Sequence, residues 1–179
     1  MRMWEEGRTK PITIICQKEL VEFFEGFTDM AYKGFSEKFK FKINFIGAKA
    51  GNIINFQDLE LLFAPTIHSI ENLAISISDS KNKICYSGDG QFTKETEELY
   101  KNSDLLIQET YLYDQVKLGH ACIKDTILMA ESQNIKCLAL THMQRDFRKN
   151  ELPKLKDSIK SDTVKIIIPE PMQEYDLSD

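Results

Sequence analysis

The segment KICYSGDGQF (83–92) is the most informative part of the sequence, because a short apolar stretch leads directly into a glycine-rich turn. Ile84, Cys85 and Tyr86 predict a buried strand. The turn sets Asp89 between two glycines, where the backbone is least restricted. A carboxylate held at a rigid strand end and open to solvent suits a functional site. Gly-Asp-Gly alone is only a turn signal, so a plain turn residue before a helix remains the alternative.

The chain before this segment has mostly strand patterns. Residues 10–17 and 38–47 predict strands, and residues 18–35 predict an amphipathic helix between them. Three more strand-like runs lead into segment 83–92 as a meander of antiparallel strands, namely 52–56, 59–67 and 72–78.

The chain after this segment alternates helices and strands. We expect helices at 93–102, 121–134 and 150–160, and strands at 103–110, 135–142 and 163–170. A meander followed by such alternation predicts an α/β fold in which packed sheets are covered by helices.

The length of 179 residues predicts one domain, residues 1–179. A content of 42% hydrophobic and 28% charged residues is typical of a globular protein. The net charge is -5 and no basic stripe is present, which argues against a nucleic-acid binder. No apolar run is long enough to span a membrane, and the first ten residues lack a signal-peptide core. The four cysteines lie in apolar runs or a helix without close pairing, which favours reduced thiols in a cytoplasmic protein.

The chain has only three histidines, and each follows a strand-like run. His68 follows LFAPTI, His142 follows KCLALT, and His120 closes the loop after residues 105–119. Imidazole and carboxylate groups suit zinc, manganese or iron, so these residues and Asp89 are candidate metal ligands. Each histidine also has the simpler interpretation of a surface or hydrogen-bonded residue.

Three stretches carry a resemblance to a known family: residues 64–77, 83–110 and 119–146. Their order and spacing resemble the C-terminal two thirds of the metallo-β-lactamase fold, and within it the ribonuclease Z-like hydrolases. The shared features are a His on a strand, a YSGD strand, an LLI-x-E strand and a closing LTH. One mismatch is Cys122, which stands where the family has a hydroxyl residue. The resemblance implies an αββα sandwich, truncated at the N-terminus.

The resemblance also implies roles for five residues. Asp89 would bridge two metal ions, with His68 a ligand of one ion and His142 a ligand of the other. Glu109 would orient His120, which would contact the scissile phosphate or protonate the leaving group. If Glu109 and His120 have no such role, they are an ion pair that ties two loops. The ions expected in an intact family member are zinc, with manganese or iron also suitable, and they would supply hydroxide at neutral pH.

Two departures from the family pattern bear on activity. The family's His-x-His-x-Asp-His motif is absent, so we expect the chain to lack its first strands and to bind metal weakly. Ribonuclease Z proper inserts a long tRNA-binding arm between the residues that match His68 and Asp89. Here those two residues are 21 positions apart, so a small phosphodiester or ester-like substrate is expected and tRNA is not.

We therefore expect a metal-dependent hydrolase that uses metal-bound hydroxide, inactive or impaired as this truncated chain. The alternatives are a catalytically dead binding or assembly module, and a thioester or lactam hydrolase on the same fold. Missing strands would leave an unpaired sheet edge and exposed apolar surface, so we also expect a homodimer. No membrane partner is expected.

Overall fold

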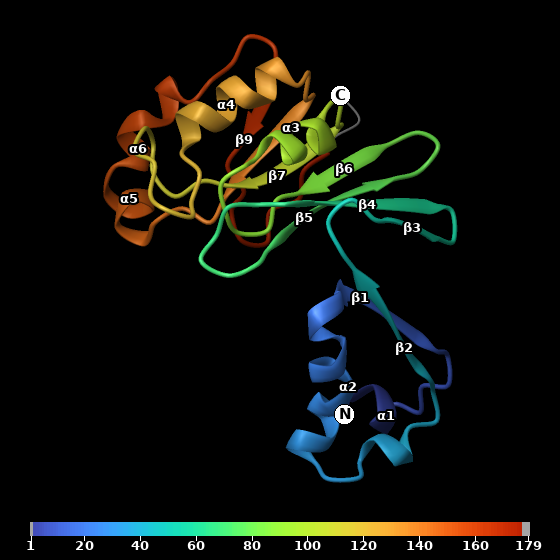
Figure 1. Ribbon diagram of the computed structural model, residues 1–179. Coiled ribbons are helices and arrows are strands. Elements are labelled where there is room, and N and C mark those ends of the chain that lie inside the picture. The colour runs from blue at the N-terminus through green and yellow to red at the C-terminus, as the bar shows by residue number, and fades with distance from the viewer. Residues whose placement is uncertain (1, 177–179) are drawn as a thin grey trace. The chain divides into compact units, whose positions relative to one another are not determined.

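The protein divides into two compact units, Met1–Lys49 and Ala50–Asp179, in a computed structural model that describes residues 2–176 (Figure 1). The prediction that the whole chain forms one domain stays a prediction.

The first unit is a β-α-β segment with flanking turns. Strands β1 (Ile12–Gln17) and β2 (Ile43–Ala48) pair in parallel, with helix α2 (Val21–Ala31) between them in the chain. The short elements are α1 (Arg2–Glu5), η1 (Lys18–Leu20) and η2 (Ser36–Lys38).

Two predicted boundaries in this unit are wrong. The helix expected over 18–35 ends at Ala31, shortly before Gly34, whose φ of 70° is left-handed. The strand expected over 38–47 begins only at Ile43, because the 3-10 turn η2 precedes it. The alternating aromatic residues at 39 and 41 therefore precede the strand.

The second unit is built on a seven-stranded sheet with the order β3-β4-β5-β6-β7-β8-β9. The strands are β3 (Ile53–Phe56), β4 (Leu59–Pro65), β5 (Leu73–Ser78), β6 (Lys83–Tyr86), β7 (Leu105–Glu109), β8 (Cys137–Thr141) and β9 (Lys165–Ile167). Strands β3 to β6 pair antiparallel and β6 to β9 pair parallel, which confirms the predicted meander and the alternation after it.

Helices follow the strands at the expected places. They are α3 (Lys94–Tyr100), α4 (Ile123–Ser132), α5 (Arg145–Asn150), α6 (Leu152–Leu155) and the 3-10 turn η3 (Lys156–Ser158). Helix α3 begins right after the turn of segment 83–92, because Thr93 and Thr96 cap each other's backbone N–H groups. Helix α5 was not expected, and it lies in the polar segment after His142.

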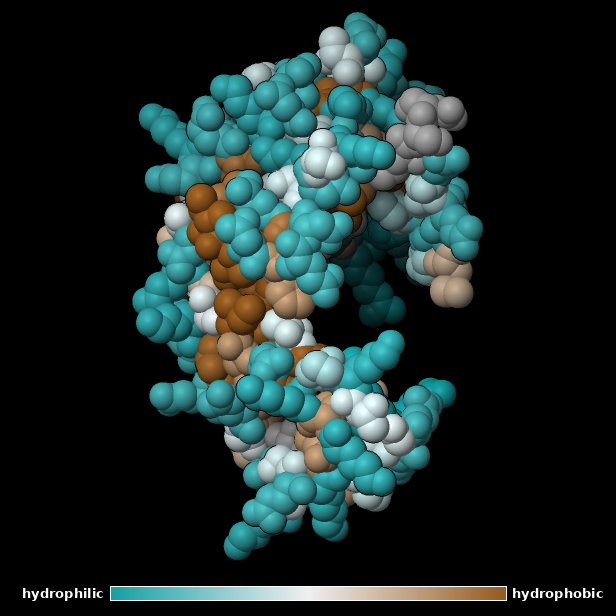
Figure 2. All heavy atoms as spheres, turned by 90° about the vertical axis from the view of Figure 1, so that its right-hand side faces the viewer, coloured by the Kyte–Doolittle hydropathy of each residue, from teal (hydrophilic) through white to brown (hydrophobic). Residues whose placement is uncertain are grey.

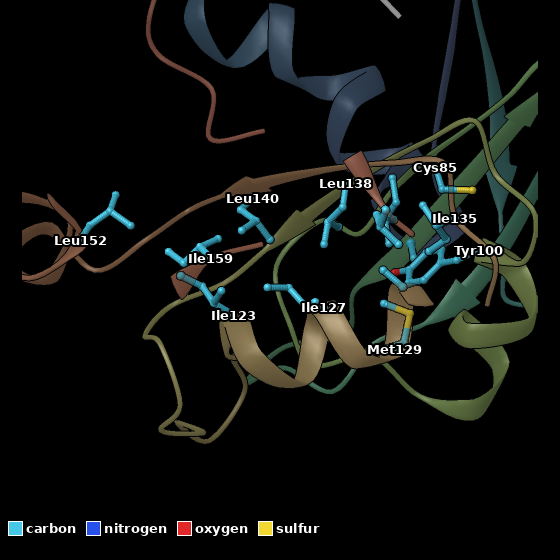
Figure 3. Packing of buried hydrophobic residues seen from close by; sticks show 14 of the residues in the cluster. Cys85, Tyr100, Ile123, Ile127, Met129, Ile135, Leu138, Leu140, Leu152 and Ile159 are labelled. Atoms are coloured by element: carbon cyan, nitrogen blue, oxygen red, sulfur yellow. The ribbon is translucent and has the colours of Figure 1, made fainter. Parts of the chain in front are cut away.

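The core of the second unit lies on one face of the sheet, under α3 and α4. Leu138 and Leu140 of β8 point from the sheet towards α4 (Figure 3). The side chains of Tyr100, Leu106, Ile123, Leu138 and Leu140 are all 0% exposed. Burying a leucine side chain contributes about 1.5–3 kcal/mol, so this cluster is the main source of stability.

The opposite face of the sheet is apolar and less covered. Across β5 and β6, Ile77 pairs with Ile84, and Tyr86 pairs with Ile75. Ile77, Ile84 and Tyr86 are 36%, 42% and 49% exposed. Figure 2 shows hydrophobic residues, in brown, exposed among largely hydrophilic ones on the face in view.

Two further expectations concern the cysteines and membranes. All four cysteines are free, and Cys85, Cys122 and Cys137 are buried while Cys16 is half-buried. Among the described residues, none of the helices has the length and apolar character needed to cross a membrane.

Candidate metal centre

The candidate residues lie at one edge of the seven-stranded sheet. Strands β6, β7 and β8 are parallel, and β4 runs in the same direction because two antiparallel pairings separate it from β6. Their carboxyl ends therefore meet at one edge, which is where open α/β sheets bind ligands. Glu109 is the last residue of β7, and His142 directly follows β8. Asp89 and His68 follow β6 and β4 by three residues each.

Three side chains form the tightest group. One ligand atom from each of Glu109, His120 and His142 lies within 4.8 Å of the others. The Glu109 Oε2 atom is 3.4 Å from His120 Nδ1 and 3.6 Å from His142 Nδ1. These separations exceed an ordinary hydrogen bond of about 2.7–3.2 Å. The three groups face each other without being bonded to each other.

The two other candidates border this group. Asp89 Oδ1 lies 3.7 Å from His142 Nε2. The His68 ring stands edge-on to the His120 ring, with 5.5 Å between the ring centroids. The structure thus brings together all five residues singled out from the sequence. The tightest group combines Glu109 and His120, expected to act in catalysis, with only one of the three expected metal ligands.

The Glu109 carboxylate is held in a fixed orientation. Its Oε1 atom accepts hydrogen bonds from the backbone N–H groups of Ala121 (2.8 Å) and Gly90 (3.2 Å). Its own N–H donates to Ser87 Oγ at 3.0 Å. The side chain is 2% exposed, and this burial raises the pKa of Glu109, against the lowering effect of the Ala121 N–H and the His120 ring.

The free atoms of this group fit a cation. Glu109 Oε2 and His120 Nδ1 are both buried, and neither has a hydrogen-bond partner in the described structure. Such buried polar atoms carry a cost of about 1–3 kcal/mol each unless a partner is supplied. Ligands at about 2.0–2.2 Å from one tetrahedral ion lie about 3.3–3.6 Å apart, which matches the separations at Glu109 Oε2. The donors are those that zinc accepts.

The sequence interpretation missed the groups that hold these residues. Tyr111 stacks on the His120 ring, with centroids 4.6 Å apart and an interplanar angle of 20°. The His142 backbone has a left-handed φ of 55°, which is uncommon outside glycine and turns its side chain to the site. Tyr111 directly follows ET (109–110), and its position beyond a strand end was the one available signal.

A cavity of about 570 Å³ lies at the opposite edge of the same sheet, where Asp79, Asp104 and Lys136 contribute to its lining. None of the five candidate residues lines it. The five candidate residues therefore lie at the carboxyl edge of the sheet, whereas this cavity lies at the opposite edge.

Sequence comparison finds relatives named ribonuclease Z. The chain is 32% identical over 83 residues to the one from Archaeoglobus fulgidus, a match that covers 44% of this chain and 27% of that protein. It is 22% identical over 199 residues to the one from Methanothermobacter thermautotrophicus, covering 82% of this chain and 64% of that protein. The chain thus spans less than two thirds of either curated relative. No protein-family model matches it.

Structure comparison finds metallo-β-lactamase folds. The fold protein YhfI from Bacillus subtilis matches with a TM-score of 0.72 and 21% identity, over 93% of this chain and 65% of that one. The short form of human tRNase Z matches with a TM-score of 0.64 and 18% identity, over 91% and 67%. The chain therefore has the metallo-β-lactamase fold, and its sequence is similar to that of ribonuclease Z.

Proposed function

We propose that the chain is a metal-dependent hydrolase of phosphodiester or related ester bonds. The observation that carries this proposal is the meeting of all five candidate residues at the carboxyl edge of the sheet, where Glu109 Oε2 and His120 Nδ1 are buried and unpartnered. The names of its relatives, hydrolases of RNA phosphodiesters, support the same reaction class.

The five candidate residues would have different roles in this reaction. His68, Asp89 and His142 would hold metal, and a divalent ion there would supply Lewis-acid activation of water and stabilise charge on the phosphoryl oxygens. Zinc is the ion we favour, with manganese or iron as the other candidates. Glu109 would keep the His120 ring oriented, because its Oε1 is fixed by two backbone N–H groups. His120 would donate a proton to the leaving group or contact the phosphate.

The chain offers few ligands for this task. It contains three histidines in all, and the His-x-His-x-Asp-His motif is absent. We expect weak metal binding and impaired turnover for the 179-residue polypeptide. A catalytically silent binding or assembly module is the second candidate, which this shortage of ligands favours.

A small phosphodiester is the substrate we favour. The residues between His68 and Asp89 are taken up by β5, β6 and three short connecting segments, which leaves no room for a tRNA-binding arm there. The names of the relatives favour RNA instead, so both substrates belong in the test. We keep the cytoplasm as the expected location, with which four free thiols agree.

Elemental analysis and turnover assays on the purified chain would test the proposal. Zinc, manganese and iron are added in turn, with bis(p-nitrophenyl) phosphate and a tRNA precursor as substrates, and with a thioester and a chromogenic lactam as competitors. We expect bound metal and slow phosphodiester cleavage, lost in Asp89→Ala and kept in Asp58→Ala, an exposed acid of the β3–β4 turn. A chain that holds no metal would contradict the proposal. Metal without turnover of any substrate would favour the binding module.

The apolar face of the sheet supports the homodimer as a further part of this proposal. Ile77, Ile84 and Tyr86 expose apolar area that association would bury. Light scattering at micromolar concentration should give twice the mass of 20.7 kDa, and a monomeric mass would contradict it.

A further inference from the structure

The turn that carries Asp89 is fastened by two side chains from the connection between β4 and β5. Thr66 Oγ1 donates to the main-chain oxygen of Asp89 at 2.8 Å. Asn72 Nδ2 donates to the same oxygen and also to Thr66 Oγ1, the latter at 3.0 Å. Both amide hydrogens of Asn72 and the hydroxyl hydrogen of Thr66 therefore have an acceptor.

The two glycines beside Asp89 leave room for this clamp of Thr66 and Asn72. A Cβ atom on Gly90 would lie 2.5 Å from Thr66 Oγ1, and one on Gly88 would lie 2.9 Å from Asn72 Nδ2. The φ angles are also left-handed, 64° at Gly88 and 118° at Gly90. The glycine turn and the clamp are therefore fitted to each other, and neither would keep its place with a bulkier partner.

The other side of the turn is tied to the candidate metal centre. Gly90 N–H donates to Glu109 Oε1 at 3.2 Å, and Gln91 and Ile67 exchange both backbone hydrogen bonds at 3.0 Å. The Asp89 carboxylate itself is 46% exposed, and its recorded contact is His142 at 3.7 Å. Its position is thus set through its main chain, to which Asn72 and Thr66 are bonded.

We propose that Asn72, acting with Thr66, is a positioning residue that aims the Asp89 carboxylate at His142 and so sets the metal affinity of the site. This inference rests on the proposed function, because it takes Asp89 as a ligand. Groups that orient a metal ligand typically change metal affinity by about 10–100-fold when removed. A hydrogen bond that served only the stability of the loop would leave that affinity unchanged.

The test uses four variants of the full chain and two readouts. Asn72→Ala and Thr66→Val remove the donors, Thr66→Ser keeps the hydroxyl, and Asn55→Ala is a matched control on an exposed face of β3. Cobalt(II) is titrated by its visible absorbance as the probe for metal, and hydrogen exchange is measured at the amides of Gly90 and Gln91.

We expect Asn72→Ala and Thr66→Val to weaken cobalt binding about 10–100-fold, with exchange faster at Gly90 and Gln91 than in the core strands. Thr66→Ser and Asn55→Ala should stay close to the parent protein. Unchanged affinity in Asn72→Ala, or exchange that accelerates equally in β7 and β8, would overturn the role of Asn72. If the parent chain binds no cobalt, the proposed function fails, and local exchange still decides whether Asn72 holds the turn.

Discussion

The two units of this protein differ sharply in what they bury. Among the described residues, the unit Met1–Lys49 has two buried hydrophobic side chains, Phe41 and Ala48. The unit Ala50–Asp179 has all the others, including the cluster around Leu106 and Leu138, and it also has the five candidate site residues. Stability and chemistry therefore come from the same unit, and the strands that supply the core end in the residues that form the site.

Separating the units should have the largest effect. Residues 50–179 should unfold cooperatively by themselves, because they keep the seven-stranded sheet and its core. Residues 1–49 alone should not fold, because a two-stranded sheet with so little buried area is at most marginally stable. Circular dichroism during thermal unfolding measures both. A cooperative transition in the fragment 1–49 would contradict the expected difference in stability between the units.

A core substitution should have the next largest effect. Leu138→Ala removes a fully buried side chain and should lower the free energy of unfolding by about 2–5 kcal/mol. Leu20→Ala in the other unit, where the side chain is 41% exposed, should change it by less than about 0.5 kcal/mol. Urea unfolding gives both values, and similar losses at the two positions would contradict the difference between the units.

Glu109→Gln should separate chemistry from stability within the second unit. The amide oxygen can still accept the N–H groups of Ala121 and Gly90, while the free carboxylate oxygen facing His120 is lost. Cobalt affinity should fall about 10–100-fold, with a smaller loss of stability than Leu138→Ala. Glu60→Gln, an exposed position on β4, is the control. A Glu109→Gln protein with the parent's cobalt affinity would remove Glu109 from the site.

Asp104→Asn should give the smallest change in the free energy of unfolding, and this change should depend on pH. Lys136 Nζ at 2.6 Å and the Lys83 N–H at 2.7 Å lower the pKa of Asp104 below its ordinary value of 3.8. The stabilisation, about 1 kcal/mol, is therefore present above pH 3.8 and is lost as the pH falls through the folded-state pKa. Urea unfolding of both proteins between pH 3 and 7 measures the difference.

The control for this prediction lies in the first unit. Glu19 pairs with Lys49 at 3.3 Å, but both side chains are about half exposed. Glu19→Gln should leave the free energy of unfolding unchanged within error, since exposed pairs contribute little. A larger effect at Glu19 than at Asp104 would reverse the expected ranking.

Much of the second unit was predictable because its patterns are local. Short runs of β-branched residues bounded by turns gave β4 to β8, and helical spacing gave α3 and α4. The late start of β2 at Ile43 was not predictable, because the aromatic residues at 39 and 41 alternate with polar residues as they would in a strand. Helix α5 has few apolar residues, and its start depends on the Gln144 side chain, which accepts the N–H of Phe147 at 2.6 Å.

The site could be predicted as a set of residues but not as a geometry. Position after a strand selected Asp89 and all three histidines, while the family resemblance added Glu109 and assigned the roles. Their grouping depends on contacts between distant segments, such as Ala121 N–H to Glu109 and Asn72 to the carbonyl of Asp89. Spacing along the chain has no information on those contacts.

The left-handed backbone of His142 has a consequence for protein engineering. Its φ of 55° costs a histidine about 1–2 kcal/mol relative to glycine, so replacement by glycine should raise the melting temperature while removing a ring from the site. Directed evolution towards heat resistance, with no selection for activity, should therefore replace this histidine by glycine. A stabilised library that keeps histidine at position 142 would mean that the imidazole contributes to folding itself.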